Sequence, residues 1–264
     1  MITLNEHLRT SMLNESIRGI DGDEKQAIGD WITDHYIIEK GRLKSVTLGN
    51  SDLIEGVVNI LKQPGSNGKY IANSRVDVIF DSRENRGVTS LTNDLFKWGT
   101  IGRNFDCSYS DIETLDGAPE KVVGSFYCGS CRKLRSLNGA PEKVECNFHC
   151  NNCDSLKSLD GAPEEVGRDF TCNGCRSLTS LKGAPRLVNG VLECKHLSSL
   201  RSLDGAPEEI GSYIELEDCP NLRSLMGLPT KNKIQIHYCK CPNLVITDED
   251  RKNFDIFQPD WDRR

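Results

Sequence analysis

The sequence has no hydrophobic run long enough to cross a membrane and no excess of positive charge. A membrane-spanning helix needs about 20 predominantly apolar residues, and the opening residues lack the basic start and apolar stretch of a secretion signal. The 33 Lys and Arg face 39 Asp and Glu in 264 residues, giving a net charge of −6 without blocks of one sign. We therefore expect an intracellular protein with no membrane partner and no specific nucleic-acid partner, because phosphate binding needs clustered Lys and Arg.

Sequence signals for catalysis are equally scarce. No glycine-rich phosphate loop is present, and no nucleophile has a base close to it in the sequence. The histidines do not follow the spacing of metal ligands; they are His7, His35, His149, His196 and His237. The sequence therefore predicts a protein that is not an enzyme and that needs no cofactor.

What the sequence does have is a strict internal repeat. Gly-Ala-Pro stands at residues 117–119, 139–141, 161–163, 183–185 and 205–207, and Gly-Leu-Pro follows at 227–229, so every step is 22 residues. A period of this length indicates supersecondary units stacked in a row, each contacting only its neighbours. The coils can therefore be compared position by position within this one sequence.

This comparison separates apolar columns from variable ones. Two apolar columns lie two places apart: Phe126, Phe148, Phe170, Leu192, Ile214 and Ile236, then Cys128, Cys150, Cys172, Cys194, Leu216 and Tyr238. Further inward columns begin at Val122, Cys131, Leu134 and Leu137. Side chains two apart share one face of a strand. We therefore predict one parallel strand per 22-residue coil, with Gly-Ala-Pro turning the chain because proline lacks the N–H that a ladder needs.

The run Phe126-x-Cys128-x-x-Cys131-x-x-Leu134-x-x-Leu137 resembles the leucine-rich repeat pattern, with Cys131 where that family has a buried Asn or Cys. The short coil with a proline turn is similar to the repeats of bacterial effector-type leucine-rich repeat proteins, over about residues 88–245. The resemblance implies an α+β solenoid that binds a partner through its strand face. The sequence departs from the family in using Phe-x-Cys where Leu-x-Leu is commoner, and in placing the next Leu three residues after the Cys.

The flanks of the repeat have a different character, and a stacked array needs caps at both ends. Residues 1–63 are expected to form a helical N-terminal segment, since Leu4, Leu8 and Met12 have the spacing of one helical face. Residues 64–100 are expected to form a β-rich N-terminal cap and residues 101–246 the solenoid. Residues 247–264 would form a C-terminal cap, with a short helix that starts at Thr247 and ends near Pro259.

The 12 cysteines fall mainly on the inward columns. Paired motifs such as Cys128-x-x-Cys131 can supply zinc with four thiolates. The same columns also accept Leu197 and Leu216, so the positions require apolar packing and not a thiolate. We therefore expect a cysteine-rich core without metal, and zinc binding is the alternative. The candidates for reactive surface thiols lie outside the columns: Cys146 and Cys239.

Between the inward residues of each strand lie residues that must point outward. Stacking would gather them into one continuous face, whose candidate partner-binding residues are Tyr127, His149, Thr171, Glu193, Tyr213, Glu215 and His237. Aromatic and histidine side chains interleaved with acids suit a protein or peptide partner with a basic or mixed surface. The alternative is a solvated sheet face without a role.

A basic column runs along the return segment of the coils. Its members form a candidate anion-binding stripe: Arg135, Lys157, Arg201 and Arg223. Like charges at the coil spacing repel each other, so a multivalent anion would be stabilising there. The favoured alternative is a solvated stripe that nearby acids neutralise: Asp116, Asp160 and Asp204.

The opening Leu4-Asn5-Glu6-His7-Leu8 resembles the first residues of many phage-encoded reading frames, which often precede Gly-Ala-Pro-Glu repeats. This resemblance implies a phage origin and, with it, a location in the host cytoplasm or in the virion. The whole sequence predicts a non-enzymatic interaction module that binds a protein or peptide on its outward strand face. The alternatives are a structural or packaged virion component and, less favoured, a zinc-binding protein. The sequence predicts no particular oligomeric state.

Overall fold

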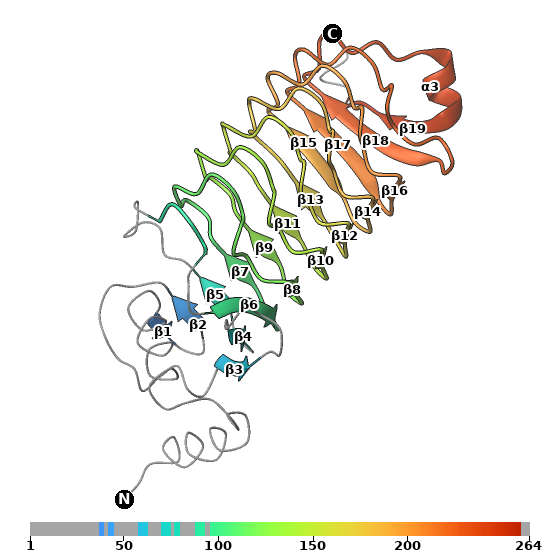
Figure 1. Ribbon diagram of the computed structural model, residues 1–264. Coiled ribbons are helices and arrows are strands. Elements are labelled where there is room, and N and C mark those ends of the chain that lie inside the picture. Colours follow the sequence, from blue (N-terminus) through green and yellow to red (C-terminus); the bar gives the residue numbers. More distant parts are fainter. Residues whose placement is uncertain are drawn as a thin grey trace, which may run out of the picture.

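The computed structural model describes residues 37–39, 42–44, 58–62, 70–74, 77–79, 88–92 and 96–259. Over these residues the chain forms a parallel β-solenoid of about seven turns, and its coils lie side by side in an elongated stack (Figure 1). The 22-residue coil predicted from the repeat is confirmed, because parallel pairing sets Phe126 beside Phe148 and Phe148 beside Phe170.

Two sheets run along the stack. The major sheet has 11 strands in the order β1 (Ile37–Glu39), β2 (Arg42–Lys44), β5 (Asp77–Ile79), β7 (Phe105–Asp106), β9 (Phe126–Tyr127), β11 (Phe148–His149), β13 (Phe170–Thr171), β15 (Leu192–Lys195), β17 (Tyr213–Glu217), β18 (Ile234–Cys239) and β19 (Phe254–Phe257). The minor sheet has eight, in the order β16 (Glu209–Ile210), β14 (Leu187–Val188), β12 (Glu165–Val166), β10 (Lys143–Val144), β8 (Lys121–Val122), β6 (Phe96–Ile101), β4 (Tyr70–Ser74) and β3 (Val58–Lys62).

The prediction of one strand per coil is therefore wrong, since coils of the repeat contribute one strand to each sheet. The second strand contains the valine column, in which Val122, Val144 and Val166 are buried and pair with one another in register. Each of these strands is only two residues long. A two-residue strand has only one inward residue, so its sequence shows no alternation of apolar and polar residues. The repeat therefore reveals the buried column but does not identify it as a strand.

The core fills the space between the two sheets without interruption. The predicted inward columns starting at Phe126, Cys128, Leu134 and Leu137 are fully buried through the central coils. The rings of Phe105, Phe126, Phe148 and Phe170 stack on one another, with centroids 5.3, 5.1 and 5.4 Å apart. Such stacking adds about 1 kcal/mol per pair to the gain from burial itself.

The cysteine columns are buried, as apolar packing predicts, and one column also forms hydrogen bonds. In four coils its thiol donates to a backbone carbonyl of the preceding coil at 3.1–3.3 Å; the pairs are Cys131 to Cys107, Cys153 to Cys128, Cys175 to Cys150 and Cys219 to Cys194. The thiols thus provide hydrogen-bond donors for backbone carbonyl groups that become buried on folding. All 12 cysteines are free, and only Cys146 and Cys239 are partly exposed.

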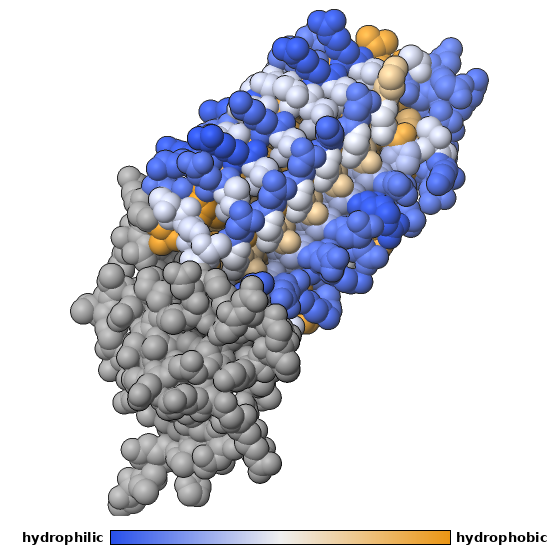
Figure 2. All heavy atoms as spheres, viewed as in Figure 1, coloured by the Kyte–Doolittle hydropathy of each residue, from blue (hydrophilic) through white to orange (hydrophobic). Residues whose placement is uncertain are grey.

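The glycine of each Gly-Ala-Pro turn is required by its backbone. Gly161 has a φ of +87°, and a Cβ there would lie 2.4 Å from the backbone nitrogen of Asn138 in the preceding coil. The glycines at the equivalent turn positions also have positive φ. The turn therefore repeats identically, and Figure 2 shows the result as polar and apolar bands that cross the coils.

At the C-terminal end, the predicted helix start is confirmed. Helix α3 (Asp248–Asn253) follows Thr247, whose side chain accepts a hydrogen bond from the Asp250 backbone, while the Asp250 carboxylate accepts from the Thr247 backbone at 2.8 Å. The predicted end near Pro259 is wrong. The helix stops at Asn253 because the chain returns to the major sheet as β19, where Phe254 is 4% exposed and packs on the core.

The N-terminal predictions have a mixed outcome. The described stretches of residues 1–63 are the strands β1, β2 and β3, so a helical segment is not supported there. The helix expected from Leu4, Leu8 and Met12 lies outside the described residues. Since α3 is the only helix of the described residues, the solenoid is not the α+β type expected. The β-rich cap expected over residues 64–100 contains the strands β4 and β5.

We predict that Gly161→Ala lowers the free energy of unfolding by more than about 2 kcal/mol, because alanine is strained at this φ and its methyl group meets backbone. Thermal unfolding followed by circular dichroism measures this. Gly129→Ala is the matched control, since its Cβ would lie 3.2 Å from its nearest neighbour and its φ is not positive. An equal loss in both variants would contradict the assignment.

We also predict that a thiol-specific disulfide reagent modifies two of the 12 cysteines quickly in the native protein, Cys146 and Cys239, and all 12 after unfolding. Burial raises the pKa of Cys107 and Cys128 well above the ordinary value and that of Cys131 to about 11, which suppresses the reactive thiolate. Peptide mapping identifies the modified positions. Rapid native labelling of Cys128 or Cys150 would show that the core is open.

Candidate functional site

The outward face of the major sheet carries all seven predicted partner-binding residues. Cross-strand pairing places six of them in one column, in the order Tyr127, His149, Thr171, Glu193, Glu215 and His237. Tyr213 lies in the adjacent outward column, beside Gln235. Thr171 is buried beneath its neighbours, and the other six are half-buried. The structure therefore brings the predicted residues together.

The first half of this column is uncharged. The Tyr127 and His149 rings stack with centroids 4.9 Å apart, and His149 Nδ1 lies 2.8 Å from Thr171 Oγ1. Desolvation lowers the pKa of His149, against a smaller opposite effect of Asp169 and Glu193. His149 is therefore neutral at pH 7, and this part of the face offers aromatic and hydroxyl groups without charge.

Asparagine and aspartate ladders border the column on both sides. On one side, Asn147 Oδ1 accepts from the Asp169 backbone N–H at 3.1 Å, and Asp169 Oδ1 accepts from that of Val191 at 2.8 Å. On the other, Asn151 Oδ1 accepts from the Asn173 backbone at 2.8 Å, as Asn173 does from Lys195. These contacts fix the edges of the face. The sequence analysis missed them, although side-chain amides recurring 22 residues apart were a signal.

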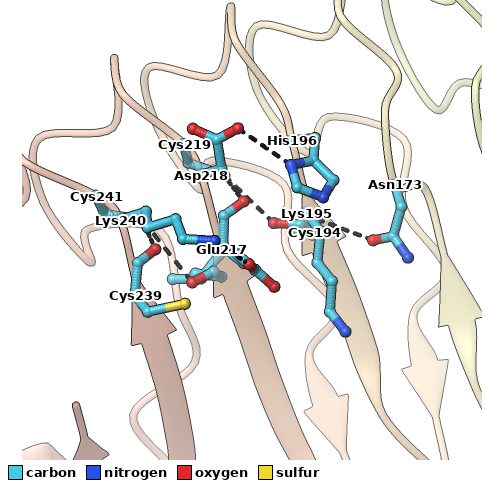
Figure 3. A network of polar contacts seen from close by, with 11 residues as sticks. Asn173, Cys194, Lys195, His196, Glu217, Asp218, Cys219, Cys239, Lys240 and Cys241 are labelled. Carbon is cyan, nitrogen blue, oxygen red and sulfur yellow. Dashed lines mark hydrogen bonds and ion pairs between the residues drawn. The ribbon is translucent and has the colours of Figure 1, made fainter. Parts of the chain in front are cut away.

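The second half of the face is charged and internally paired (Figure 3). Lys195 Nζ lies 2.9 Å from Glu215 and 3.7 Å from Glu193. Beside them, Lys240 Nζ lies 2.9 Å from Glu217, and this hydrogen bond lowers the pKa of the Glu217 carboxyl. His196 Nδ1 lies 3.1 Å from Asp218 across the neighbouring coils. Both lysines of this region are thus paired, but four carboxylates face them, so the region keeps a net negative charge.

A pocket of about 290 Å³ opens on the uncharged half of the face. It is named the tyrosine pocket here, and its lining residues are Ser108, Tyr109, Tyr127, Gly129, Ser130, His149, Asn151 and Asn152. Tyr109 is 62% exposed. The sequence analysis did not select Tyr109, because the coil that contains it departs from the 22-residue spacing.

A second pocket of about 320 Å³ lies where the face reaches β19. This histidine pocket is lined by Glu215, Leu216, His237, Tyr238, Cys239, Phe257, Gln258 and Pro259. The His237 ring stacks on Tyr213 at 4.6 Å and is tilted against Phe257 at 5.0 Å, and Phe257 is half exposed. His237 is four coils from His149, so these two histidines, one in each pocket, are about 19 Å apart along the stack.

The candidate anion-binding stripe lies on the return segment, away from this face. Its four members, Arg135, Lys157, Arg201 and Arg223, are all exposed. Among the described residues, the ion pair of the stripe joins Arg135 to Glu113 at 3.7 Å. The nearby acids, Asp116, Asp160 and Asp204, instead accept hydrogen bonds from the hydroxyls of Thr114, Ser158 and Ser202. These aspartates stabilise the local turn, and their hydrogen bonds are not made to the basic residues of the stripe.

Neither metal clusters nor membrane spans occur in the part of the chain that the structure describes. No three His, Cys, Asp or Glu side chains converge there in a way that could hold a metal ion. No helix of those residues has the length and apolar character required to cross a bilayer. In the paired cysteine motifs, the thiols of Cys131 and Cys153 instead donate hydrogen bonds to backbone carbonyls of the preceding coil.

No protein-family model matches the chain, and no curated protein or solved structure is significantly similar to it. The resemblance to leucine-rich repeats and the phage origin therefore stay predictions. The solenoid architecture stands on the geometry of the coils themselves.

We predict that His149 makes the protein less stable in mild acid. Its pKa is lower in the folded chain than the ordinary 6.5, so it contributes stability above about pH 6.5 that is lost as the pH falls through the folded pKa. The thermal midpoint of the wild type should fall more between about pH 7.5 and about pH 5 than that of His149→Gln. Parallel curves for the two proteins would contradict the burial of the imidazole.

Proposed function

We propose that this protein is a non-enzymatic interaction module that binds a protein or peptide on the outward face of the major sheet. The observation that carries the proposal is the pair of pockets with exposed aromatic walls on this one face. Binding energy at interfaces concentrates in a few aromatic residues that fill or line pockets. Tyr109 and Tyr127 supply such walls at one end, and His237 and Phe257 at the other.

The surface between the pockets supports the same role. Its two lysines are paired within the protein, and the surplus of carboxylates suits a partner with a basic or mixed surface. A distance of about 19 Å corresponds to about six residues of extended peptide. One short segment could therefore occupy both pockets while it lies across the paired region.

Recognition on this face must use side chains. The backbone groups of the interior strands already bond to neighbouring coils, as Phe126 N–H does to Asn147 O at 2.8 Å and Phe148 N–H to Asp169 O at 2.9 Å. A peptide cannot be added there as another strand, because strand addition needs a free sheet edge. A partner must therefore be recognised by contacts with the outward side chains.

We predict that the full-length protein, immobilised, enriches peptides from a random display library. The triple variant Tyr127→Ala, His149→Ala and Phe257→Ala should reduce that enrichment by about tenfold or more, since aromatic contacts in both pockets are lost. The matched control is Lys121→Ala with Lys143→Ala, which removes exposed ion-paired residues of the minor sheet.

Circular dichroism would verify that both variants remain folded. Enrichment that is unchanged in the triple variant, or lost in the control, would remove this face as the binding site.

A further inference from the structure

The tyrosine pocket is uncharged in a protein of which 27% of residues are charged. None of its lining residues carries a formal charge at pH 7, because desolvation keeps His149 neutral. The two tyrosine hydroxyls and the Asn151 Nδ2 group make no hydrogen bond within the described part of the chain, whereas Asn151 Oδ1 is occupied by the Asn173 backbone. The pocket therefore presents aromatic rings together with free hydrogen-bond donors.

Tyr109 is placed at a conformational cost. Its φ is 64°, in the left-handed region, and Tyr109 carries the largest ring among the residues at this position, the others being Ser130, Asn152, Gly174, His196, Asp218 and Lys240. Bulky side chains disfavour this conformation by about 1–2 kcal/mol. Since the ring is 62% exposed, burial in the core does not offset the cost. Contact of the exposed ring with a ligand would offset this cost.

Gly129 opens the space between the two tyrosines. The equivalent positions in the following coils carry Asn151, Asn173 and Lys195, each with a side chain on the outward face. A Cβ at Gly129 would lie 3.2 Å from the Asn151 carbonyl oxygen and 3.9 Å from Ser108 Oγ. A side chain fits here after a shift of a few tenths of an ångström, and the lack of one at Gly129 leaves the floor of the pocket open.

We propose that the tyrosine pocket binds a proline-rich segment of the partner in the polyproline II conformation; this inference rests on the proposed function. Such a segment is uncharged, and its pyrrolidine rings pack on aromatic faces. Its carbonyls have no internal partners, so they can accept from the tyrosine hydroxyls and from Asn151 Nδ2. The pocket offers donors where the ligand offers acceptors.

The repeat distances of the two structures also match. A polyproline II helix rises about 3.1 Å per residue with three residues per turn, so one of its faces recurs about every 9.3 Å. Two coils of the solenoid span about 9.6 Å. A segment aligned with the stack would therefore present equivalent groups to Tyr109 and to Asn152, which lie two coils apart on the left-handed column.

The charge around the pocket argues against a nucleic acid, the other class of ligand that stacks on aromatic rings. The flanking charged residues of the face are Asp106 and Asp169, and the lining contains no Lys or Arg to contact phosphate. An uncharged oligosaccharide would share the stacking chemistry, and the experiment therefore includes one.

Two substitutions test the pocket without disturbing the fold. Gly129→Asn introduces the residue that the next two coils carry and fills the pocket floor. Tyr109→Asn removes one ring and introduces asparagine, the residue type found at the equivalent left-handed position of a later coil, Asn152. This substitution also relieves backbone strain, because asparagine tolerates positive φ. Met226→Asn is the matched control, because Met226 is an exposed apolar residue outside the binding face and both pockets, and the equivalent position of an earlier coil carries Asn138.

Fluorescence anisotropy of a labelled nonaproline, titrated with the full-length protein, measures binding. We expect saturable binding by the wild type, about tenfold or greater weakening in Gly129→Asn and Tyr109→Asn, and no change in Met226→Asn. Absence of binding, equal binding by all four proteins, or selective binding of a labelled maltohexaose in place of nonaproline would overturn the proposal.

The peptide library distinguishes this failure from that of the proposed function. If the library yields peptides without proline that still depend on Tyr127 and His149, the binding face stands and the proline preference is wrong. If the library yields no peptides and nonaproline does not bind, both are wrong.

Discussion

The backbone hydrogen bonds between equivalent positions of neighbouring coils are the constraint on which the rest of the structure depends. They fix the register at 22 residues, as the bonds from Phe126 to Asn147, from Phe148 to Asp169 and from Phe170 to Val191 show. Once the register is fixed, each sequence column becomes a physical row. The phenylalanine stack, the thiol hydrogen bonds and the outward face are all consequences of that alignment.

The register also explains how much the sequence could predict. The inward columns and the outward face follow from 22-residue spacing alone, and the structure places both as predicted. The minor sheet did not follow, because strands such as Lys143–Val144 contain a single inward residue. The pockets did not follow either, since Tyr109 and Phe257 belong to coils at which the spacing changes. The regular spacing therefore predicts the scaffold, whereas the pockets form where the spacing changes and could not be predicted from it.

The two halves of the outward face treat polar groups in different ways. Around Lys195 and Glu217, the lysines are already paired and the surplus charge is negative. Around Tyr127, several donors stay free beside aromatic rings. A ligand gains more from unsatisfied groups than from groups that must first exchange a partner. Affinity would therefore be concentrated at the uncharged end, and the charged half would act mainly through shape and the rejection of mismatched charge.

The identical turn in every coil has a consequence for the reach of the face. Because each coil of a solenoid contacts only its neighbours and five coils end in the same Gly-Ala-Pro corner, one of these coils could be duplicated or deleted without changing the geometry of the others. The separation of the tyrosine and histidine pockets would then change in steps of about 4.8 Å. For a segment bound in both pockets, as proposed, the required length would thus be set by the number of coils between them.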